Sequence, residues 1–297
     1  MRFGFFISSC LLATLPSTPA FAAKQVVFKP RDSWVANFAE DRCELTRFFY
    51  AGDREVRLRA TQYAPGPMVL WSLATHEPFK RSFQFRLGST GEFVEKDGLA
   101  QMQWGEMQGT LFDASFLSVP KRSKASLSKP IWTDAEREEA TSAVDAIEIR
   151  KGGETMRLET GNMRAPISVL TACSENLVAE SGIDMEAHKT LSRRATPRDL
   201  EALEEEISRS YPKSTEREQK TGRVQLLINV DQTGKATGCH AAPEFSHPDF
   251  DKSLCDVLTT KTVYDPALDS QGNAIPSYFV ETVYYATLTR SSTLISY

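Results

Sequence analysis

The sequence contains little of the chemistry that most enzymes need. It has only four histidines among 297 residues, and it contains no G-x-S-x-G, H-E-x-x-H, P-loop or G-x-G-x-x-G motif. The nearest candidate for an exposed nucleophile is Ser89, in Gly88-Ser89-Thr90-Gly91, where a plain turn is the simpler interpretation. We therefore expect no catalytic residues, no cofactor and no enzyme activity.

Basic blocks and membrane-spanning segments are also lacking. The formal net charge is -4, and no block is basic enough to indicate nucleic-acid binding. The apolar run over residues 3–15 has about 13 residues, whereas a helix needs about 20 to cross a bilayer. We expect no stable insertion into a membrane.

The apolar run instead has the features of a cleavable signal peptide. Arg2 precedes it, proline breaks it at positions 16 and 19, and Ala20-Phe21-Ala22 fits the small-x-small rule of signal peptidase. We predict that residues 1–22 are removed and that the mature protein lies in the periplasm of a Gram-negative-type cell. An uncleaved anchor is one alternative. A lipoprotein is another, although Cys10 lies inside the run rather than after it.

Four cysteines remain after the signal peptide, and an even number in an oxidising compartment favours disulfides. They allow three connectivities, and the domain layout favours Cys43–Cys173 and Cys239–Cys255. A zinc site formed by Cys239, His240, His247 and Cys255 is the alternative. Because neighbouring strand residues point to opposite faces, Cys239 and His240 are poorly placed to share a metal, and we expect none.

The pattern predicts an α+β fold with a β-rich N-terminal domain over residues 24–182. Alternating apolar residues predict strands over 55–63 and 82–87, and Gly152-Gly153 indicates a hairpin. A capping box at Thr133 predicts a short helix, and a second helix is expected over 166–180, with Cys173 on its buried face.

A linker and connector helix are expected over residues 183–210, followed by a β-α-β domain over 211–290. Thr196-Pro197-Arg198-Asp199 predicts the start of the connector helix, with Thr196 as N-cap. Strands are expected over 222–230, 235–241 and 277–289, and a helix over 249–258.

Five short motifs stand in order within residues 211–290. They are Tyr211-Pro212-Lys213, Gly222-Arg223-Val224, Val230-Asp231-Gln232-Thr233-Gly234-Lys235, Phe250-Asp251-Lys252-Ser253-Leu254 and Asp265-Pro266-Ala267-Leu268-Asp269-Ser270-Gln271-Gly272. This series resembles the C-terminal domain of TonB and related energy-transducer proteins. The resemblance implies a TonB-like fold and a partner in the cell envelope, with an outer-membrane transporter as one candidate.

The long final strand is the expected partner-binding surface, because an edge strand leaves N–H and C=O groups that a second chain can complete. On this hypothesis Tyr278, Val280, Thr282 and Tyr284 contact an envelope protein or peptide, or a second copy of the chain in a homodimer. The alternative for this strand is that the chain's own tail, residues 291–297, covers it.

Two other functional classes stay open. One is an envelope hydrolase with its site in the N-terminal domain. The other is an anchored energy transducer for TonB-dependent transmembrane transport, although the scattered prolines do not form the Pro-rich spacer of that family.

The signal-peptide interpretation predicts a mature N-terminus near Ala23 on protein released with the periplasmic fraction. N-terminal sequencing of the exported protein checks this. Finding Met1 on membrane-bound protein would show instead that the apolar run is an anchor.

Overall fold

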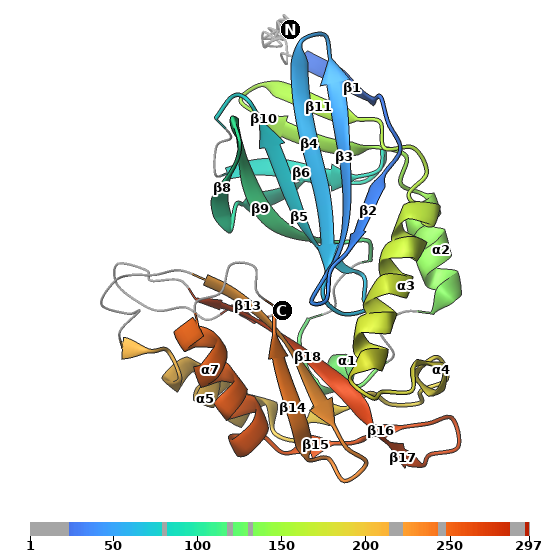
Figure 1. Cartoon of the computed structure of the whole chain (residues 1–297), viewed down its shortest axis with the longest axis vertical. Helices are drawn as coiled ribbons and strands as arrows, with labels where there is room; N and C mark the ends of the chain where they lie inside the picture. The colour runs from blue at the N-terminus through green and yellow to red at the C-terminus, as the bar shows by residue number, and fades with distance from the viewer. Residues whose placement is uncertain are drawn as a thin grey trace, which may run out of the picture.

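The computed structural model describes residues 24–78, 82–117, 121–129, 133–213, 222–242, 248–285 and 295–296. The expected signal peptide lies outside these ranges, as does the end of the expected final strand. A large N-terminal sheet and a smaller C-terminal sheet lie at opposite ends of the molecule, with helices along one side of their junction (Figure 1). No helix in the described part is both long and apolar enough to cross a membrane.

The N-terminal part is a single curled sheet of eleven strands. Their order is β7-β6-β10-β11-β1-β3-β4-β5-β9-β8, with β2 paired to β3. The strands are β1 (Lys24–Pro30), β2 (Val35–Phe38), β3 (Cys43–Ala51), β4 (Arg54–Gln62), β5 (Met68–Thr75), β6 (Ser82–Leu87), β7 (Val94–Asp97), β8 (Ala100–Trp104), β9 (Met107–Ser115), β10 (Ile147–Lys151) and β11 (Glu154–Leu158).

Strand β1 links the two halves of this sheet. Its residues 24–28 pair in parallel with β11, whereas residues 29–30 pair antiparallel with β3. The halves enclose an aromatic core, in which Phe83 and Phe85 of β6 pack edge-on against Phe112 of β9, with centroid distances of 5.0 and 4.9 Å. Alternate apolar side chains of β3, β4, β5, β6, β9, β10 and β11 therefore fill the inside of the curl.

Two helices close one end of the curled sheet. In α2 (Asp134–Ser142), Thr133 and Glu136 form the predicted capping box. Helix α3 (Arg164–Glu180) begins two residues before the expected start and buries Ile167, Leu170 and Cys173. Cys173 is disulfide-bonded to Cys43 of β3, as predicted.

The connecting segment contains α4 (Met185–His188) and α5 (Leu200–Arg209), and the prediction for the start of α5 is wrong. Thr196 and Pro197 form a two-residue strand, β12 (Thr196–Pro197), which pairs with β15 (Tyr264–Asp265). Asp199 is the N-cap instead, and its carboxylate accepts a 3.0 Å hydrogen bond from the Ala202 N–H. The dihedral angle that proline fixes also suits extended backbone, so a strand partner far along the chain decides the outcome.

The C-terminal sheet has the order β14-β13-β18-β19. Its elements and their neighbours are α1 (Lys124–Leu127), β13 (Gly222–Val230), β14 (Ala236–Ala241), α7 (Pro248–Asp256), the π-helix η1 (Val257–Lys261), β16 (Ala267–Leu268), β17 (Ala274–Ile275), β18 (Ser277–Tyr285) and β19 (Ile295–Ser296). Helices α5 and α7 cover one face, where Ile207, Leu254 and Phe279 share a core. The observed mixture of strands and helices confirms the α+β class.

The turn between β13 and β14 requires a glycine. Gly234 has a φ of 84°, and a Cβ at this position would lie 2.1 Å from the carbonyl oxygen of Tyr264. The Gly234 carbonyl also accepts a 3.1 Å hydrogen bond from the Tyr264 N–H. The turn is thereby held against the segment that follows η1.

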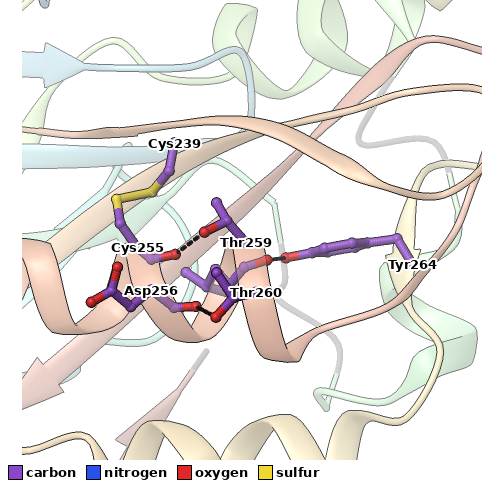
Figure 2. The surroundings of a disulfide bond; sticks show 7 residues. Cys239, Cys255, Asp256, Thr259, Thr260 and Tyr264 are labelled. Carbon is purple, nitrogen blue, oxygen red and sulfur yellow. Dashed lines mark hydrogen bonds between the residues drawn. A yellow bond between two sulfur atoms is a disulfide. The ribbon is translucent and has the colours of Figure 1, made fainter.

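The second predicted disulfide is also present. Cys239 of β14 is bonded to Cys255 of α7, so the outer strand of the sheet is tied to the helix beneath it (Figure 2). The Tyr264 hydroxyl donates to the Leu258 carbonyl at 2.9 Å in the same region. The zinc alternative for Cys239 and Cys255 is therefore replaced by the disulfide.

The two disulfides are expected to stabilise the protein unequally. The sequence separations are 130 residues for Cys43–Cys173 and 16 for Cys239–Cys255. Loop-closure entropy then gives about 5 and about 3 kcal/mol respectively. Urea unfolding of the two paired Cys→Ser variants checks the ranking. A larger loss for the Cys239–Cys255 pair would contradict the entropic account.

Candidate functional site

The four residues expected to bind a partner lie on β18, and their side chains point towards the N-terminal domain. Tyr278 is 4% exposed, and its ring stacks on His188 with a centroid distance of 5.1 Å. Val280 packs against an apolar cluster that contains Val178 and Ile183. Tyr278 is therefore covered by the chain's own connector, whereas Val280 is half-buried and partly accessible.

The other two residues of this set differ in their surroundings. Thr282 is half-buried. Tyr284 donates a hydrogen bond from its hydroxyl to the carboxylate of Asp113 on β9, so it joins the two domains. Burial and the Asp113 charge raise the pKa of Tyr284 well above its usual value, and the phenol stays protonated at neutral pH.

The backbone of these four residues does face the outer edge of β18. The Ala242 N–H donates to the Gln225 carbonyl at 2.8 Å, so the backbone groups of Gln225 on β13 point towards β14. The direction of the backbone N–H and C=O groups alternates from one residue to the next along an antiparallel strand. The groups of Leu226 therefore point to the other side, where they bond to Glu281 of β18. By the same alternation, backbone N–H and C=O groups point away from β13 at Tyr278, Val280, Thr282 and Tyr284.

This β18 edge is partly occupied by other parts of the chain. Tyr284 pairs with Ile295 of β19, so residues near the C-terminus lie against the strand, as in the alternative of a covered edge. Glu281, which is fully buried, accepts a 2.7 Å hydrogen bond from Arg122, and Arg122 also bonds to Glu204 of α5. The segment before α1 is thus held close to the middle of β18.

A buried ion pair joins the two domains beside β18. Arg223 of β13 is 2% exposed, and its guanidinium donates two hydrogen bonds, of 2.8 and 3.0 Å, to the carboxylate of Asp113. Burial opposes the positive charge of Arg223, but the attraction of Asp113 outweighs this cost and raises the pKa of Arg223. Removing either partner of such a desolvated bidentate pair would leave the other charge buried without compensation.

Sequence reasoning missed the importance of Asp113 and Arg223. Arg223 was visible as a charged residue within an apolar strand, and Asp113 as a carboxylate inside the run from Met107 to Ser115. The two positions are 110 residues apart, so nothing in the local pattern links them.

The opposite edge of the C-terminal sheet is formed by β14. Leu227 pairs with His240, and Ile228 with Cys239. The backbone groups of Ala242 point towards β13, where its N–H bonds to Gln225. Because the direction alternates along the strand, the N–H and C=O groups of Cys239 and Ala241 point away from β13. Within the described ranges these outward groups have no hydrogen-bond partner, so they form an open strand edge.

A cleft of about 520 Å³ lies beside this open edge, between the two domains. Its floor is the face of the C-terminal sheet that carries Leu227, His240 and Val280. The opposite wall comes from α3 and from two turns of the N-terminal domain, and it includes Glu40, Asp41 and Glu180. A strand placed along β14 would direct alternate side chains into this cleft, where the wall favours basic groups.

The N-terminal domain has a cavity of its own, of about 620 Å³. There the Tyr50 hydroxyl donates to Glu55 at 2.8 Å, and the His76 ring lies 3.2 Å from the same carboxylate. Arg54 pairs with Glu154 at 2.7 Å, and this hydrogen bond lowers the pKa of Glu154 despite partial burial. The carboxylates of Glu55 and Glu154 are thus engaged by donors and a cation.

Ser89 does not belong to a hydrolytic triad in the described part of the chain. Its hydroxyl donates to Asp145 at 2.8 Å and accepts from Arg157 at 2.8 Å, with no histidine among its contacts. The hydrogen bond from Ser89, supported by Arg157, lowers the pKa of Asp145 against the effect of burial. This arrangement holds the Gly88–Gly91 turn against the hairpin strands. The described residues also contain no group of three His, Cys, Asp or Glu side chains suited to a metal ion.

Comparison with known proteins gives no relative, since no family model, no curated protein and no solved structure matches the chain.

Replacing Asp113 by alanine should destabilise the protein by about 3–5 kcal/mol, because it leaves Arg223 buried and unpaired. Urea unfolding measures the loss. Glu205→Gln is the matched control, since Glu205 pairs with Arg209 on the exposed face of α5 and should change stability by less than about 1 kcal/mol. Equal effects of the two substitutions would contradict a central role for the Asp113–Arg223 pair.

Proposed function

We propose that this is an exported, non-enzymatic binding protein of the cell envelope that holds an extended segment of a partner protein by β-strand addition. The observation that carries the proposal is the open edge of β14 beside the interdomain cleft. An added strand would complete the outward N–H and C=O groups of Cys239 and Ala241 and place alternate side chains in the cleft.

The β14 edge is a better site than the β18 edge for this purpose. At β18, Tyr284 already pairs with β19, and Arg122 lies on Glu281. On β14, His240 is exposed and Cys239 and Ala241 are half-exposed, so an incoming backbone meets less of the chain itself. Binding through Tyr278, Val280, Thr282 and Tyr284 remains the second form of the same proposal.

Two sequence features support the location and the class of partner. The N-terminal apolar segment with its Ala20-Phe21-Ala22 site favours export, and the two disulfides suit an oxidising compartment. The resemblance of residues 211–290 to the TonB C-terminal domain favours a periplasmic location and an envelope partner, with an outer-membrane transporter as one candidate. The acidic wall of the cleft favours a partner segment that carries lysine or arginine.

An array of overlapping synthetic peptides that covers the periplasm-exposed segments of the cell's outer-membrane proteins tests the proposal. The tightest peptide is then titrated by fluorescence anisotropy. In Ala241→Pro the outward donor is lost, and we expect about tenfold weaker binding at an unchanged melting temperature.

Two further proline variants identify the edge. His240→Pro removes a donor that faces β13, so it should lower the melting temperature instead. Val280→Pro should leave peptide binding intact if β14 is the edge, and abolish it if β18 is. Unchanged binding in both Ala241→Pro and Val280→Pro would contradict strand addition altogether. A loss of self-association instead of peptide binding in either variant would assign the edge to a homodimer.

A further inference from the structure

The outer face of the N-terminal sheet carries an arginine that lies between two aromatic rings. Val56 and Leu58 of β4 face the core inside the curl, so Arg57 between them points outwards. Its guanidinium carbon is 5.8 Å from the centroid of the Phe48 ring of β3 and 4.7 Å from that of the Trp104 ring of β8. All three residues are half-buried. We call Phe48, Arg57 and Trp104 the arginine–aromatic cluster.

Small residues between β4 and β8 allow Trp104 to reach Arg57. In the row of paired residues that crosses the sheet from Arg57, β5 contributes Ala74 and β9 contributes Gly109. Ala74 is fully buried, and a Cβ on Gly109 would lie 2.9 Å from the Cβ of Ala74. A larger side chain at Gly109 would therefore not fit, and the absence of one leaves room for the tryptophan ring above the row.

Arg57 lacks a counter-charge. It makes no hydrogen bond or ion pair with any residue that the structure describes, and its Nε is buried without a partner. Arg59, two residues along the same strand, also lies over Trp104, at 5.0 Å from the ring centroid, so two positive charges share one ring. Burial lowers the pKa of Arg57, and the charge of Arg59 adds to this effect against the attraction of Glu44.

The carboxylates around the cluster do not supply the missing partner. Glu44 accepts hydrogen bonds from Arg42 and Arg59, each at 3.0 Å. Glu55, on the same face of β4, accepts a 2.8 Å hydrogen bond from the tyrosine opposite it on β3. Glu106, in the exposed turn that follows β8, forms no ion pair within the described ranges. An anion from outside the chain would therefore find Arg57 unengaged.

The free part of Arg57 has the geometry to receive a carboxylate. Of its three guanidinium nitrogens, only Nε is both buried and unpartnered, so the two terminal nitrogens are accessible to solvent. The flanking rings hold the guanidinium by cation–π attraction and limit its rotation, and its planar fork matches the two oxygens of a carboxylate. Arginine beside a half-exposed tryptophan is also the composition typical of the residues that dominate protein–protein binding energy.

A partner protein fits this surface better than an anionic membrane does. Recognition of anionic lipids by charge usually needs a cluster of about four or more lysines and arginines. Here a single unengaged guanidinium stands among Glu44, Glu55 and Glu106, and the formal net charge of the chain is -4. A single carboxylate, with apolar neighbours that cover the rings, suits this arrangement.

We infer that the arginine–aromatic cluster docks an acidic side chain of a partner protein. The carboxylate accepts two hydrogen bonds from the terminal nitrogens of Arg57, and the residues beside it cover Phe48 and Trp104. This surface belongs to the N-terminal domain, so it goes beyond the proposed strand addition at β14 and does not depend on it.

Fluorescence anisotropy of fluorescein-labelled hexaglutamate, titrated with the full mature chain at low ionic strength, tests the inference. The negative net charge of the chain opposes non-specific binding of this peptide, so saturable binding reports a local site. We expect Arg57→Gln to weaken binding about tenfold. Arg209→Gln is the matched control, because it removes the same charge from an exposed pair with Glu205, and it should leave binding unchanged. No binding at millimolar protein, or equal losses in the two variants, would overturn the inference.

Two further arms identify the contact and the class of partner. Arg57→Lys keeps the charge but loses the planar fork, so it should also weaken binding. If Arg57→Gln does not fold, Arg57→Lys decides alone, and unchanged binding in that variant overturns the inference. Arg57-dependent sedimentation with phosphatidylglycerol vesicles, without hexaglutamate binding, would assign the cluster to a membrane surface and overturn it as well. Ala241→Pro should retain hexaglutamate binding, so failure of the strand-addition proposal is distinguishable from failure of this one.

Discussion

The bidentate pair between Asp113 and Arg223 joins the two sheets that border the cleft beside β14. A charged pair that is removed from water has a narrow range of acceptable geometries, because any separation leaves a buried charge without compensation. The Tyr284 hydroxyl on the same carboxylate adds a third element to the contact. The interdomain cleft beside β14 therefore has walls whose spacing is set by an electrostatic constraint as well as by apolar packing.

The local elements were largely predictable from the sequence, because they depend on neighbouring residues. Alternation of apolar and polar residues predicts the strands around Val56 and Phe83, and the capping box predicts the start of α2. The cysteine count and the domain layout together predict both disulfides. Such features follow from side-chain periodicity and cap chemistry, which a short window of sequence contains. The wrong start for α5 at Thr196 shows the limit, since a strand partner about 70 residues away overrode a good helix-start pattern.

The candidate sites were less predictable, because they depend on which faces the domains present to each other. The period of β18 shows that Tyr278 and Tyr284 share a face, but not that the N-terminal domain and α4 cover it. Likewise, Glu180 of α3 and His240 of β14 belong to segments with no common motif, and only the fold brings them to one cleft. Long-range juxtaposition of this kind leaves no trace in composition or spacing.

The disulfide between Cys239 and Cys255 has a consequence for the cost of adding a strand. Edge strands commonly fray, and a partner must then order both its own backbone and the edge that receives it. Here the covalent bond to α7 holds the middle of β14 in place before any partner arrives, so ordering entropy is lost mainly by the incoming segment. For the proposed strand addition, reduction of this bond would free β14 from α7 and raise the entropy that binding must overcome.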